Sequence, residues 1–143
     1  DGAQLILGAV AVESGDVEAG LAQLRSARRN RHAAGAGSNR SFWATTLVEA
    51  CIKAGLLDEA AAVLAEAFEA VVTQQELFWL PEVYRLAGEL IALGATLGQW
   101  AEDAQPATSE AAFTLAIEAA RAIGSVALER RAVTSLEQLR QRG

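Results

Sequence analysis

The chain has 143 residues, a formal net charge of −6 at pH 7, and 52% hydrophobic residues. This length suffices for one domain with a buried core, and the acidic balance argues against a general nucleic-acid binder or a binder of anionic membranes. The single Cys excludes an internal disulfide, and the sequence lacks an apolar run of about 18 residues that could span a membrane. We therefore expect a cytoplasmic protein.

Turn residues and the hydrophobic pattern predict a chain built from helices, and only two prolines interrupt it. Asp16 and Asp58 are expected to cap the second and fourth helices, and Thr108 or Ser109 to open the sixth. Pro81 fits a helix only in its first turn, so the fifth helix is expected to begin properly at 80 or 81. In chain order the predicted helices span about 3–14, 16–33, 38–54, 58–74, 76–93, 108–124 and 125–141.

Apolar residues recur at steps of three and four in two of these helices, which places them on one helix face. Such a face must be buried against neighbouring helices. Cys51 also falls on a face that periodicity predicts to be buried, which indicates an inert core thiol. The predicted buried positions are Ala60, Val63, Leu64, Ala67, Phe68 and Val71 in the fourth helix and Val126, Val133, Leu136 and Leu139 in the last.

Three segments of the chain repeat one pattern: two copies lie 40 residues apart, and a third, degenerate copy runs through Tyr84 and Ala112. The corresponding residues are Gly20, Leu24 and Ala27 in one copy and Ala60, Leu64 and Ala67 in the other. Self-similarity at such a period indicates stacked helical hairpins. We therefore predict a single all-α domain with repeats at about 3–35, 38–74 and 76–124, followed by a capping helix at 125–141.

The small and large residues of these hairpins resemble the tetratricopeptide (TPR) repeat. The residues that carry the resemblance are Leu7-Gly8, Leu47-Val48, and Tyr84, Ala87-Gly88 and Ile91. The chain departs from that pattern because its repeats run near 40 residues and because the third contains an insertion around Trp100. The resemblance implies a superhelical stack of antiparallel hairpins that binds a protein or peptide on its concave face.

A narrower resemblance rests on the segment 80–90 and on the segment 116–124. Both are similar to the C-terminal repeat region of large bacterial signalling proteins. Those proteins join a class III adenylate or guanylate cyclase domain, or a winged-helix DNA-binding domain, to a P-loop ATPase domain. The resemblance implies a non-catalytic sensory or scaffolding arm. Because the chain lacks Met and begins Asp-Gly, we expect it to be part of a longer protein.

The TPR register predicts which side chains line the concave face. On the fifth helix one guanidinium can meet two carboxylates three and four residues away, an arrangement that either stabilises the helix or contacts a ligand. The equivalent face of the third helix is also polar. The predicted binding site for a protein, a peptide or another domain of the same parent protein is Phe42, Thr45, Glu49, Lys53, Glu82, Arg85 and Glu89.

A basic run late in the second helix suggests a further surface. Its cations suit the negative end of a helix, and they could also meet an acidic partner. Trp100, in the insertion, either folds back onto the stack or reaches a partner. The predicted secondary surface is Arg25, Arg28, Arg29 and Trp100.

Two aromatic pairs and an uneven charge distribution complete the candidate contacts. Phe42-Trp43 and Phe78-Trp79 are expected to pack between hairpins, and exposure of either pair would mark an interaction surface instead. Residues 54–120 hold 11 acidic residues and one Arg, whereas residues 121–143 hold five Arg and two Glu. This polarity could favour head-to-tail contact between copies.

The sequence offers little for catalysis. With one His and one Cys it has no zinc-ligand set, and it lacks a Gly-rich phosphate loop. We therefore expect no enzyme activity, no metal and no cofactor. Two alternatives to a partner-binding module remain, namely a homo-oligomerisation module that forms a homodimer, and a small-ligand sensor with a pocket beneath the 94–108 loop.

Overall fold

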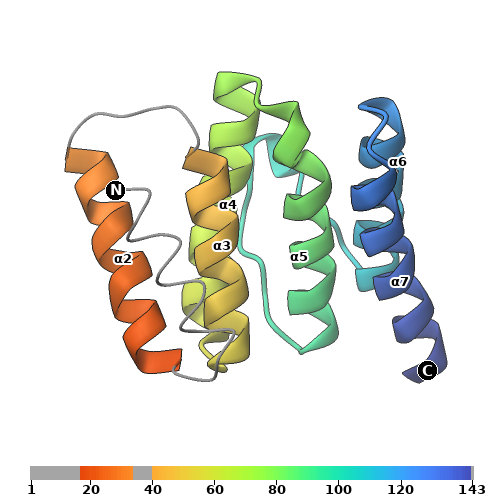
Figure 1. Cartoon of the computed structure of the whole chain (residues 1–143). Coiled ribbons are helices and arrows are strands. Elements are labelled where there is room, and N and C mark those ends of the chain that lie inside the picture. The colour runs from red at the N-terminus through yellow and green to blue at the C-terminus, as the bar shows by residue number, and fades with distance from the viewer. Residues whose placement is uncertain (1–16, 34–39, 143) are drawn as a thin grey trace.

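A computed structural model describes the backbone of residues 17–33 and 40–142, which form helices and no strand (Figure 1). This part of the chain is all-α, as predicted. The first predicted helix and Asp16 lie outside the described residues. None of the described helices is both long enough and apolar enough to cross a bilayer. The elements are α2 (Val17–Ala33), α3 (Arg40–Lys53), α4 (Leu57–Gln74), η1 (Leu77–Trp79), α5 (Leu80–Ala92), η2 (Ala101–Asp103), α6 (Ser109–Ala122) and α7 (Val126–Arg142).

Two of the predicted helix starts are confirmed and one is wrong. The Thr108 hydroxyl accepts a hydrogen bond from the backbone N–H of Ala111 at 3.1 Å and so caps α6. Pro81 lies in the first turn of α5, as expected. Asp58 is not a cap, because Leu56 holds the N-cap position of α4 without a side-chain hydrogen bond. Asp58 instead lies inside the first turn, where its negative charge suits the helix dipole.

The helices pack as antiparallel neighbours in a layered array. α3 pairs with α4, and α5 pairs with α6. α5 also contacts both α3 and α7, so these three helices form one row, which we call the odd-helix face (Figure 1). This arrangement places side chains that are distant in sequence on a common surface.

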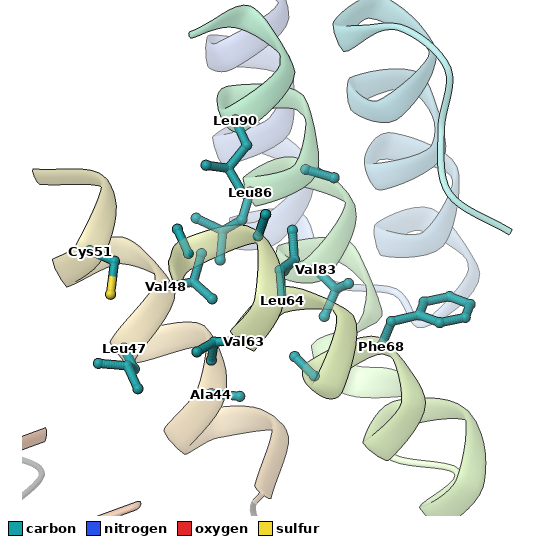
Figure 2. Packing of buried hydrophobic residues seen from close by; sticks show 14 of the residues in the cluster. Ala44, Leu47, Val48, Cys51, Val63, Leu64, Phe68, Val83, Leu86 and Leu90 are labelled. Atoms are coloured by element: carbon teal, nitrogen blue, oxygen red, sulfur yellow. The ribbon is translucent and has the colours of Figure 1, made fainter. Parts of the chain in front are cut away.

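A continuous hydrophobic core joins α3, α4 and α5 (Figure 2). Leu47, Leu64 and Leu86 are each at most 1% exposed and come one from each helix. The predicted face of α4 is buried along its whole length, which confirms that expectation. The thiol of Cys51 is fully buried, also as predicted. Burial of these apolar faces supplies the main driving force for stacking the hairpins.

α5 and α6 cross closely because a glycine meets an aromatic ring. A Cβ atom added at Gly88 would lie 2.5 Å from Cε1 of Phe113, whose side chain is fully buried. No side chain fits that space without a shift of the ring. The pattern of small residues beside large ones, predicted from the Ala87-Gly88 pair, therefore has a direct steric cause at this crossing.

The last helix is less buried than its apolar spacing predicts. Leu136 is buried and Val133 and Leu139 are half-buried, but Val126 is 62% exposed. The expectation that Val126 joins the buried face is wrong. α7 packs mainly against α6 and α5, and its first turn leaves Val126 exposed.

Candidate functional site

The predicted concave-face residues of α3 and α5 lie on the odd-helix face. Glu49 of α3 and Glu82 and Arg85 of α5 are brought together by side-chain contacts. Glu89 lies near enough to Arg85 to act on its charge. Lys53 is exposed at the C-terminal end of α3. The side chain of Phe42 lies outside the described residues.

Arg85 is the centre of this cluster and is only 7% exposed. Its Nε donates to Glu82 Oε2 at 2.8 Å and its Nη2 donates to Glu49 Oε1 at 2.9 Å. Burial alone would lower the pKa of the guanidinium. The hydrogen bond to Glu82 and the charges of Glu82, Glu49 and Glu89 outweigh burial, so the pKa of Arg85 is raised. The side chain is therefore a fixed cation that holds α3 and α5 together.

Arg131 of α7 completes the cluster, and the sequence analysis did not identify it. Its Nη2 donates to Glu49 Oε1 at 2.9 Å, and its Nε lies 3.5 Å from Glu82 Oε1. Two guanidinium groups thus share the Glu49 carboxylate. We call Glu49, Glu82, Arg85 and Arg131 the four-residue network. The excess of arginine over glutamate in residues 121–143 indicated that this segment could form ion pairs with acidic residues. It did not distinguish Arg131 from the other arginines.

Several residues of the predicted binding face are buried by the four-residue network and its neighbours. Thr45, Glu82 and Arg85 are 6–7% exposed. They do not form an open groove in this structure, because a guanidinium from α7 lies against the two carboxylates. A partner that bound both carboxylates would have to displace the Arg131 side chain.

The arginines of the predicted secondary surface lie in different environments. Arg25 makes two hydrogen bonds to Glu59 of α4, one of them from Nε to Oε2 at 2.8 Å. This hydrogen bonding raises the pKa of Arg25 and ties α2 to the next hairpin. Arg29 is exposed, and the side chain of Arg28 lies outside the described residues.

Trp100 is a core residue, which corrects its assignment to a surface. It is 3% exposed, and its ring stacks on Phe68 of α4 with 4.5 Å between ring centroids. Its backbone N–H donates to Gln105 Oε1 at 3.0 Å, which fixes the loop locally. Leu97 is also buried. The 94–108 segment therefore fills the space where a small-ligand pocket was considered.

Exposed apolar side chains gather at the turn between α4 and α5. Val72, Leu77 and Phe78 are 53%, 52% and 56% exposed, and we call them the tip cluster. Phe78 packs edge-on against the half-buried Trp79 with 5.3 Å between ring centroids. In contrast, Trp43 is 4% exposed. Burial in the core is thus confirmed for Trp43, whereas Phe78 shows the exposure expected of an interaction surface.

Among the side chains that the structure describes, no group of three His, Cys, Asp or Glu residues is placed to hold a metal ion. Comparisons with protein-family models, curated proteins and solved structures found no match for this chain.

Proposed function

We propose that this chain is a TPR-like protein-binding module of a larger bacterial signalling or transcriptional regulator in the cytoplasm. The observation that supports this most directly is the tip cluster. Three large apolar side chains, each more than half exposed, lie within seven residues of one another at the end of α4 and in η1. Apolar and aromatic side chains at a surface are the usual anchors of protein interfaces.

The arrangement of the helices supports a binding role more broadly. Antiparallel hairpins that contact only their neighbours give an extended surface with separate edges and faces. The repeat pattern of the sequence and the close α5–α6 crossing at Gly88 agree with the TPR-like register. The cyclase, ATPase or DNA-binding activity of the proposed parent would lie in other domains.

Self-association is the second candidate function, and Val126 favours it. This residue is 62% exposed on α7, the last described helix, which has neighbours on one side only. An apolar side chain at the end of an array can meet a second copy. The tip cluster could serve the same purpose, so the two functions must be separated by experiment.

Sedimentation equilibrium over a wide concentration range is the first measurement. A monomer at all concentrations would favour a different protein as the partner. A dimer that Phe78→Ser abolishes would identify the tip cluster as a self-association surface. Leu93→Ser is the matched control, because Leu93 is 50% exposed but lies at the other end of α5.

Site-specific photocrosslinking then tests for a partner protein in cells. A photoreactive phenylalanine analogue at position 78 should give a defined crosslinked product that the same analogue at position 93 does not give. Identical crosslinking at both positions would contradict binding through the tip cluster. Purification of the crosslinked product from position 78 identifies the partner.

A further inference from the structure

The four-residue network contains a site for a second guanidinium. Arg85 is buried between Glu49 and Glu82, and one cation facing two carboxylates leaves one negative charge uncompensated. The charge of Glu89 also acts on this region. A further cation is therefore electrostatically favoured at the side of the pair that faces α7.

Arg131 occupies this site as a ligand from the same chain. Its Nη2 contacts Glu49 and its Nε contacts Glu82, so a single planar group spans carboxylates from two helices. An ammonium group presents one point charge and could not span both carboxylates in this way. The geometry selects arginine, presented by a helix that lies along α5.

α7 buries fewer side chains than α5, and its main packing partner is α6. The described buried residues of α7 are Ala132, Ser135 and Leu136, whereas α5 buries eight residues. The ion pairs that hold α7 are partly open to solvent, since the Arg131 side chain is 51% exposed and the Arg140 side chain, paired with Glu110, is 63% exposed. Ion pairs that are partly exposed to solvent are screened by salt, and so they hold a helix less firmly than fully buried pairs do.

From these observations we propose that α7 is an autoinhibitory helix. It masks the Glu49–Glu82 carboxylate pair with Arg131, and an arginine-bearing helix of a partner protein takes its place. The partner is thus a helix with an arginine that can reach both carboxylates. This inference rests on the proposed protein-binding function and specifies the partner and its regulation.

Hydrogen exchange on the full chain tests whether α7 is released. Arg131→Gln should raise the exchange rates of α7 amides at least tenfold and leave those of α5 and α6 unchanged. Arg140→Gln is the matched control, because it removes a more exposed ion pair of the same helix, and it should change the α7 rates less than threefold. Equal exchange of α7 and α5 in wild type and in both variants would show that α7 is integral to the fold and would overturn the proposal.

Binding of a defined peptide tests the recognition site. A labelled peptide with the sequence of residues 126–142 should bind the Arg131→Gln chain at least tenfold more tightly than the wild-type chain. The same peptide with Gln at the position of Arg131 should bind the variant chain at least tenfold more weakly. Equal binding of both peptides, or no binding of either, would overturn the inference. Since neither measurement involves Phe78, the crosslink at the tip cluster can succeed even if this proposal fails.

Discussion

Glu49 on α3 and Arg131 on α7 are separated by 82 residues in sequence, yet Arg131 Nη2 lies 2.9 Å from Glu49 Oε1. The same carboxylate oxygen accepts a hydrogen bond from Arg85 of α5, which lies between the two helices. One acceptor thus connects three helices of the odd-helix face. The acidic middle and the basic end of the chain meet within one molecule where Arg131 contacts Glu82, and again where Arg140 pairs with Glu110.

Loss of Arg85 should be costly because it leaves a buried carboxylate without its main partner. We expect Arg85→Met to lower the free energy of unfolding by about 3 kcal/mol, as for other broken buried ion pairs. Urea denaturation followed by circular dichroism measures this change. Adding Glu82→Gln should restore part of the stability, because the isolated charge is then removed.

Arg121→Met is the control for that experiment. Arg121 pairs with Glu129, but its side chain is 65% exposed, so the loss should be below about 1 kcal/mol. Equal destabilisation by the Arg85 and Arg121 substitutions would show that the buried ion pairs of Arg85 contribute no more to the free energy of unfolding than an exposed ion pair does.

Because Gly88 lies against the ring of Phe113, a single methyl group added at position 88 should destabilise the protein. Gly88→Ala should destabilise the protein by about 1–3 kcal/mol through overpacking, although alanine is the better helix former. Combining it with Phe113→Leu should cost less than the sum of the two single changes, because the smaller side chain makes room for the new Cβ. Strict additivity in thermal or urea unfolding would argue against a steric clash at this crossing.

Trp100 provides a test of the folded-back loop. Trp100→Ala should lower the free energy of unfolding by about 3–5 kcal/mol if the loop unfolds together with the core. Trp100→Phe should cost less than about 1.5 kcal/mol, since it keeps a ring against Phe68 and removes a buried indole N–H that lacks an acceptor. Similar losses for both substitutions would be inconsistent with packing as the role of this residue.

The N-cap of α6 can be tested with two threonines close together in sequence. Thr108→Ala removes the hydroxyl that accepts from Ala111 and should cost about 1 kcal/mol. Thr114→Ala changes an exposed residue in the middle of the same helix and should be neutral or slightly stabilising because of helix propensity. In urea denaturation the midpoint of Thr108→Ala should therefore lie below that of Thr114→Ala. The reverse order would rule out capping by Thr108.

Much of the fold could be predicted because the signals are local. Helix periodicity identified the buried face of α4, and the restricted geometry of Pro81 placed the start of α5. The small-residue pattern predicts a close helix crossing at Gly88, where the structure places the ring of Phe113. Asp58 was misassigned because a carboxylate near a helix start suits both the cap and the first turn, and local sequence does not separate these positions.

The sequence by itself thus determined the all-α class, the approximate helix boundaries and the presence of charged and aromatic candidates, since these depend on residues within a few turns of one another. Only the tertiary structure decided that Arg131 reaches Glu49, that Trp100 is buried against Phe68 and that Phe78 remains exposed. Each of these outcomes depends on which distant helix lies beside the residue. Helical periodicity gives the face that a side chain occupies, but not the neighbour that covers it.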